Sequence, residues 1–142
     1  MKNLAQRAVD TAKSQGASYA DCRIIFTDVE SITVKNGKIG SLDIGEDIGF
    51  GVRVIVNGAW GFASSPNLNA ENIDRVAGEA VRVAKASAQL KGMDVRLAAE
   101  PPVAETWQTP VVEDPFSVPI AEKLTMLMEI DRILRIDSRI TN

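Results

Sequence analysis

The sequence contains no histidine and only one cysteine, Cys22, among its 142 residues. Without histidine the chain lacks the commonest general base, the Ser–His and Cys–His pairs, and every zinc site built on imidazole. A single cysteine cannot form an internal disulfide, which fits a reducing compartment. We interpret Cys22 as a small packed side chain rather than a reactive thiol. We therefore expect no cofactor and no metal in this chain.

The sequence also lacks a long hydrophobic run and an excess of basic residues. No apolar segment approaches the ~20 residues that a membrane helix requires, and the segment after Met1 is charged and amphipathic, unlike a secretory signal. The 16 Lys and Arg residues are outnumbered by 19 Asp and Glu residues, which gives a net charge of −3. Nucleic-acid-binding surfaces are usually basic. We expect a cytoplasmic protein without a membrane partner or direct contact with nucleic acid.

The residues that are present predict an α+β fold. Apolar residues at helical spacing predict a first helix that starts near Leu4 and ends before Gly16, and a second helix over about 70–85. Asn67 or Asn69 is placed to cap the second helix. The apolar side of this helix is rich in alanine, so it can lie close to a sheet. Both helices are expected to cover one face of that sheet.

Between the two helices, alternating apolar and polar residues predict a mainly antiparallel meander sheet of about five strands. Asn36-Gly37 and Asn57-Gly58 are the strongest turn signals, because both positions of a type I′ turn need positive φ. Pairing outward from the second turn sets large residues on one strand opposite small residues on the next. Pairing from the first turn mismatches the apolar faces unless a β-bulge intervenes, and we expect that bulge at Gly40.

The chain beyond the second helix is punctuated by proline and shows no sustained period, which predicts an extended linker. The expected organisation is an α+β domain over 1–95, a linker over 96–118, and a segment 119–142 that holds a third helix and the start of a missing carboxy-terminal domain. Ser117 is placed to cap the third helix. Its expected apolar face consists of Ile120, Leu124, Leu127, Ile130 and Leu134. The last residues alternate like the beginning of a strand at Ile136, Ser138 and Ile140.

The ribbon GFGVRVIVNGAWGF carries the candidate site residues. On its face away from the helices, Trp60 and Phe62 lie beside Arg53 and beside the bare backbone of Gly49 and Gly51. The aromatic rings can pack over the glycines, and Arg53 can form a cation–π contact with them. Alternatively, these five residues can face a peptide or a partner chain. No residue of the chain is assigned a catalytic or metal-binding role.

Arg53 needs a carboxylate partner, because an unpaired charge in an apolar strand is costly. The nearest acids in the sequence are Asp43, Glu46 and Asp47, which we otherwise interpret as a solvated turn. Their spacing does not match a calcium loop. A structural ion pair and contact with a ligand both remain open for Arg53.

The order of these features resembles the amino-terminal domain of the TldD/PmbA family, known as modulators of DNA gyrase and including zinc metallopeptidases. The resemblance rests on ASYADCRI, ITVKNGKI, the ribbon extended to GFGVRVIVNGAWGFASS, the helix NAENIDRVAGEAVRVAKA and the later EKLTMLMEIDRILR, which span nearly the whole chain. It implies that zinc and the catalytic residues lie in a carboxy-terminal domain that acts on peptides. It also implies dimers, and it makes Arg53, within Gly-Val-Arg, the first candidate for a role beyond packing.

The expected function is that of a non-catalytic amino-terminal domain, which shapes the peptide channel of such a metallopeptidase and contributes subunit contacts. Its partners would be a second copy or another TldD/PmbA subunit, with a peptide as substrate of the longer protein. Having no histidine, the chain alone is expected to be inactive. Two alternatives remain open. One is a stand-alone interaction module that contacts gyrase or a toxin–antitoxin component, and the other is a metal-free hydrolase that uses Asp or Glu.

Overall fold

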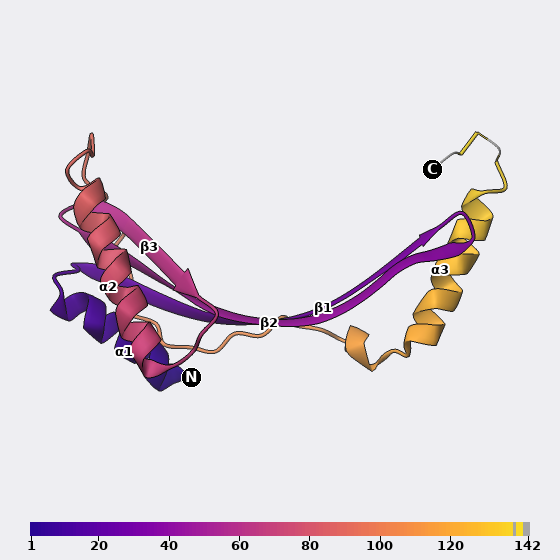
Figure 1. The fold of residues 1–142 in the computed structure, drawn as a ribbon, viewed down its shortest axis with the longest axis horizontal. Coiled ribbons are helices and arrows are strands. Elements are labelled where there is room, and N and C mark those ends of the chain that lie inside the picture. The colour runs from indigo at the N-terminus through magenta and orange to yellow at the C-terminus, as the bar shows by residue number, and fades with distance from the viewer. Residues whose placement is uncertain (138, 141–142) are drawn as a thin grey trace. The chain divides into compact units, whose positions relative to one another are not determined.

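The computed structural model describes residues 1–137, 139 and 140, and all structural statements below refer to these residues. They form three α-helices and one three-stranded antiparallel sheet in the order β1-β2-β3 (Figure 1). The elements are α1 (Lys2–Ser14), β1 (Tyr19–Lys35), β2 (Lys38–Val56), β3 (Ala59–Ser65), α2 (Ala70–Ser87), the 3₁₀ turn η1 (Pro115–Ser117) and α3 (Ile120–Leu134). The α+β class is confirmed.

The sheet has two long strands, β1 and β2, and the shorter β3, where the sequence predicted about five short strands. The first two expected strands are both part of β1, and the next two are both part of β2. The acidic residues Asp43, Glu46 and Asp47 therefore lie exposed within a strand, not in a turn. Polar residues interrupt the apolar pattern, but they do not interrupt the backbone hydrogen bonds between two neighbouring strands. The prediction ended a strand wherever the apolar alternation stopped, although β1 and β2 continue beyond those points.

Both predicted hairpin turns are present. The φ angles are 52° at Asn36, 70° at Gly37, 49° at Asn57 and 72° at Gly58, as a two-residue turn with positive φ at both positions requires. The predicted register of the second hairpin is confirmed over its whole length. Its partners are Val56 with Ala59, Ile55 with Trp60, Val54 with Gly61, Arg53 with Phe62 and Val52 with Ala63.

The first hairpin contains a one-residue shift in register. The two-residue turn sets Lys35 opposite Lys38, so next to the turn an odd-numbered residue of β1 faces an even-numbered residue of β2. Nearer the core, however, the even-numbered Cys22 of β1 and the even-numbered Val52 of β2 lie on the same face of the sheet. Because side chains alternate with a period of two, the register must shift between the turn and the core. A β-bulge makes such a shift. Its location at Gly40 remains a prediction.

The helices α1 and α2 cover one face of the sheet, and the core lies between them and the sheet (Figure 1). Asn69 caps α2, since its side chain accepts a hydrogen bond from the Asn72 N–H. The alanine-rich face of α2 lies very close to β3. A Cβ atom placed on Gly61 would be 2.1 Å from the Ala80 carbonyl oxygen and 2.5 Å from the Ala84 nitrogen. Glycine at position 61 therefore sets the distance between helix and sheet.

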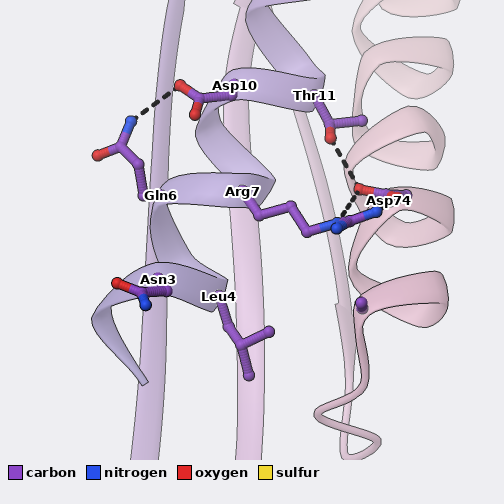
Figure 2. A pocket seen from close by; sticks show the side chains of 8 residues that line it. Asn3, Leu4, Gln6, Arg7, Asp10, Thr11 and Asp74 are labelled. Carbon is purple, nitrogen blue, oxygen red and sulfur yellow. Dashed lines mark hydrogen bonds and ion pairs between the residues drawn. The ribbon is translucent and has the colours of Figure 1, made fainter.

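A charged clamp joins α1 to α2 at the solvent side of this core (Figure 2). Arg7 donates two hydrogen bonds to Asp74, from Nε at 3.0 Å and from Nη2 at 2.6 Å, and the Thr11 hydroxyl donates a third at 2.8 Å. These bonds from Arg7 and Thr11 hold the pKa of Asp74 below its ordinary value. The polar groups of Arg7, Thr11 and Asp74 are hydrogen-bonded to one another. We therefore interpret the shallow pocket around them as part of the contact between the two helices and not as a ligand site.

The chain divides into two compact units. The first consists of Met1–Thr27 and Asp47–Glu105 and contains the whole core described above. The second consists of Asp28–Glu46 and Thr106–Asn142, so it combines the turn end of the first hairpin with α3.

In the second unit, α3 is held to the hairpin by charged groups. Lys123 forms an ion pair with Glu30 at 2.5 Å, and both side chains are largely buried. Asp131 accepts a hydrogen bond from the Gly37 N–H at 2.8 Å and one from Arg135 at 2.7 Å. These contacts tie one face of α3 to the hairpin.

One prediction about α3 was wrong, and another holds only in part. Ser117 does not cap the helix, because it ends η1 and donates its hydroxyl hydrogen bond to the Asp114 carbonyl, while Pro119 precedes the first residue of α3. Of the predicted apolar face, Ile120, Leu124 and Leu127 are partly buried, whereas Ile130 and Leu134 are exposed. Lys123 and Asp131, which were not part of that face, are turned inward to their partners.

The expected strand after α3 is not formed in the described residues. Arg135 and Ile136 continue from the helix as a turn, and Ile136 donates its N–H to the Ile133 carbonyl. Ser138, part of the predicted alternation, lies outside the described residues. Across the described part of the chain, no helix combines the length and apolar character needed to cross a membrane.

Candidate functional site

The sheet face that does not carry α1 and α2 contains the candidate site. Along each strand every second residue points to this face, which brings odd-numbered residues of β1 and β2 together with even-numbered residues of β3. A hollow of about 660 Å³ lies there, entirely within the first compact unit. Its lining residues are Asp21, Arg23, Ile25, Thr27, Asp47, Ile48, Gly49, Phe50, Gly51, Arg53, Phe62, Ser64, Ser65 and Pro66.

Arg53 is held at one end of this hollow by three neighbours. Its Nε donates a hydrogen bond to Asp21 Oδ2 at 2.8 Å, and its Nη2 forms an ion pair with the same oxygen at 2.8 Å. Its guanidinium carbon lies 5.0 Å from the centre of the Trp60 ring. The Trp60 ring in turn meets the Tyr19 ring edge-on, with 5.9 Å between centroids. The hydrogen bond from Arg53 to Asp21 raises the pKa of the guanidinium further. Arg53 is therefore fixed in place and permanently charged.

The partner of Arg53 differs from the three predicted acids. Asp21 lies on β1, 32 residues away from Arg53 in the sequence. Asp43, Glu46 and Asp47 have no hydrogen bond or ion pair to Arg53 among the described contacts. The sequence offered a signal for this pair, because Asp21 and Arg53 both alternate with apolar residues that pack in the core. Matching the two residues required the shifted register of the first hairpin.

The Phe62 ring lies over Gly51 and covers only this one of the two glycines, whereas the sequence predicted aromatic cover for both. A Cβ atom on Gly51 would be 2.7 Å from the Phe62 ring, so a larger residue there would require the exposed ring to shift. Gly49 has no aromatic cover, since a Cβ atom there would meet only the Ser65 carbonyl oxygen at 3.6 Å. The five predicted site residues thus lie on the sheet face without helices, and four of them line the hollow. Trp60 does not line it but contacts the Arg53 guanidinium.

The described residues carry no recognisable catalytic or metal site. No group of three or more His, Cys, Asp or Glu side chains among them is arranged to hold a metal ion. Burial raises the pKa of the half-buried Cys22 thiol to about 11, so it is not a thiolate at neutral pH. The zinc that the family resemblance implies does not fit the residues of this chain, and no chemical step is assigned to it here.

Comparison with known proteins agrees with the fold. Residues 20–84 match the sequence model of the PmbA/TldA metallopeptidase domain 1. A metalloprotease of Methanocaldococcus jannaschii is 30% identical over 111 residues, which are 78% of this chain and 25% of that protein. A metalloprotease of Methanothermobacter thermautotrophicus is 29% identical over 119 residues, which are 84% of this chain and 25% of that protein. The chain spans about a quarter of the length of these curated relatives.

Two solved structures share the fold at low sequence identity. TldE from Thermococcus kodakarensis superposes with a TM-score of 0.62 and 13% identity, over 94% of this chain and 28% of that one. A candidate modulator of DNA gyrase from Bacteroides thetaiotaomicron gives a TM-score of 0.57 and 21% identity, over 88% of this chain and 28% of that one. The chain therefore belongs to the TldD/PmbA family, of which it carries the first domain.

Proposed function

We propose that this chain is the non-catalytic amino-terminal domain of a TldD/PmbA-type metalloprotease, and that its open sheet face forms part of the channel for a peptide substrate. The hollow of about 660 Å³ on that face is the observation that carries the proposal. It combines apolar side chains with a few fixed polar groups, as ligand-binding surfaces commonly do. Without histidine the chain has no imidazole to activate a nucleophile. Hydrolysis is therefore assigned to another part of such an enzyme.

Peptide binding to the chain tests this proposal. A fluorescein-labelled digest of unfolded casein should bind the chain, and Phe62→Ser should weaken the binding at least about fivefold, because Phe62 offers the largest apolar surface in the hollow. Fluorescence anisotropy is the measurement. Phe26→Ser is the matched control, since Phe26 is 59% exposed, Phe62 is 58% exposed, and Phe26 does not line the hollow. Equal loss in both variants, or no binding at all, would contradict the proposed function.

The proposed subunit contacts are supported by apolar side chains on the second compact unit. Ile39 and Ile44 of the hairpin and Ile130 and Leu134 of α3 are exposed. Apolar surface of this kind is typical of interfaces.

We expect the chain to sediment as a dimer at micromolar concentration, and Ile44→Asp to shift it toward monomer, because a buried charge would oppose association. Circular dichroism should show the variant folded. A chain that stays monomeric at ~100 μM would argue against this part of the proposal.

A further inference from the structure

The bare backbone at Gly49 leaves a place for a side chain in the hollow. Ile25 and Phe62, which also line the hollow, are each 58% exposed, although both are large apolar residues. A Cβ atom on Gly49 would meet only one atom, at ordinary van der Waals distance, whereas Gly51 is covered by the Phe62 ring. The space above Gly49 is therefore unfilled, and its apolar neighbours favour an apolar group there.

Two charges in the hollow lack a close partner. The Arg23 side chain is 75% exposed, and within the described residues its one ion pair is a long contact of 3.9 Å from Nε to Asp21. Asp21 already accepts a hydrogen bond from Arg53 Nε and forms an ion pair with Arg53 Nη2. The side chain of Asp47, further along β2, has no hydrogen bond or ion pair among the described residues. Arg23 and Asp47 thus offer one weakly paired positive group and one unpaired negative group.

The positions of these groups indicate a ligand with an extended backbone. Asp47, Gly49 and Gly51 follow one another at intervals of two along β2, and Arg23 lies toward the Arg53 end because it neighbours Asp21. In an extended peptide, side chains that point to the same side are also two positions apart. A central side chain above Gly49 would then have its second neighbours facing Arg23 and Asp47.

We propose, on the basis of the proposed peptide-binding function, that this hollow selects extended peptide segments with one side-chain pattern. The pattern is a central apolar residue, flanked two positions away by an acidic residue on one side and a basic residue on the other. The apolar side chain occupies the space above Gly49 between Ile25 and Phe62, the acidic group pairs with Arg23, and the basic group pairs with Asp47. Gly49 is a specificity-determining residue because it keeps that space open.

The test uses short peptides with blocked ends and a fluorescent label. The probes are Glu-Ser-Leu-Ser-Lys and its reverse, Lys-Ser-Leu-Ser-Glu, which cover both directions of the bound chain. The controls replace both charged residues by Gln or replace Leu by Ala. We expect one of the two orders to bind best, the Ala peptide to bind about tenfold more weakly, and the Gln peptide to bind about two- to fivefold more weakly. Added salt should remove the difference between the charged and the Gln peptides.

Variants of the chain locate the binding. Gly49→Val should weaken binding of the better-binding peptide at least about tenfold, because the valine side chain fills the space above position 49 without displacing the backbone. Gly45→Val is the matched control and should leave binding unchanged, since Gly45 lies in the same strand with no atom near its Cβ position and outside the hollow. Arg23→Gln should abolish the preference for the charged probe over the Gln peptide, whereas Arg82→Gln, on the solvent side of α2, should retain it.

The outcomes separate this inference from the proposed function. If casein fragments bind through Phe62 but all short peptides bind equally well, the proposed function stands and the selectivity is wrong. If Gly49→Val binds the better probe as tightly as the unchanged chain does, the pocket above Gly49 is wrong. If neither casein fragments nor short peptides bind, both proposals are overturned.

Discussion

Replacing Gly61 with alanine should lower the free energy of unfolding by about 3 kcal/mol or more, although it adds only one methyl group. The added Cβ atom would lie 2.1 Å from the Ala80 carbonyl oxygen and 2.5 Å from the Ala84 nitrogen. Both are backbone atoms inside α2, so they cannot rotate away as a side chain could. The helix would have to move off the sheet and would loosen its contacts with Val54 and its neighbours.

Urea unfolding followed by circular dichroism measures this effect. Gly49→Ala is the matched control, because it makes the same change in β2 but meets only the Ser65 carbonyl at 3.6 Å. It should change the free energy of unfolding by less than ~1 kcal/mol, since alanine restricts the unfolded chain more than glycine does. Similar losses in the two variants would mean that α2 does not pack on Gly61 as described.

Trp60→Ala should lower the free energy of unfolding by about 3 kcal/mol. Trp60 lies in a paired strand, meets the Tyr19 ring edge-on and supports the Arg53 guanidinium. Its removal leaves a gap behind Arg53 and takes away an aromatic pair and a cation–π contact. The effect should reach the whole first unit, because Arg53 also links β2 to β1 through Asp21.

The other tryptophan serves as the control. Trp107 lies in the segment without helix or strand and is 78% exposed, so Trp107→Ala should change the free energy of unfolding by less than ~0.5 kcal/mol. Denaturant midpoints of the two variants, measured against the unchanged chain, give the comparison. A shift of equal size in both would show that the paired ribbon is not where Trp60 contributes to stability.

Local signals in the sequence were sufficient for much of the first unit. The Asn57-Gly58 turn allows a single register, so the pairing of Val54 with Gly61 and the close approach of α2 followed from counting residues. The cap at Asn69 was one of two candidates, because capping depends on residues within one turn. These features require no knowledge of distant contacts.

Features that depend on distant residues could not be predicted in the same way. The pairing of Arg53 with Asp21 requires the register of the long first hairpin, which its turn alone does not determine. The inward face of α3 was predicted from apolar spacing, but Lys123 lies inward because Glu30 meets it there. A charged residue joins a buried face when another element supplies its partner, and helical periodicity contains no information about that partner.

Four of the residues that line the hollow were named as candidates from the sequence, but the groups around them were not. The alternation of the ribbon placed Arg53, Phe62 and both glycines on one face. The contribution of β1, through Arg23 and its neighbours, was not foreseen, because the strand was assigned to the sheet without a register. The sequence therefore predicted a site formed by two strands, β2 and β3, whereas residues of β1, β2 and β3 all line the hollow.

The contacts between α3 and the first hairpin bear on how the chain folds during synthesis. Lys123 and Glu30 are 93 residues apart in the sequence, and Asp131 and Gly37 are 94 residues apart. At a translation rate of about 5–20 residues per second, roughly 5–20 s pass between the synthesis of the hairpin and that of its helix. A β-hairpin closes within about 1–10 μs, so the nascent hairpin is formed before α3 is synthesised, and the surface that α3 later contacts is uncovered. This interval is when a chaperone, or the hairpin of a neighbouring nascent chain, has access to that surface.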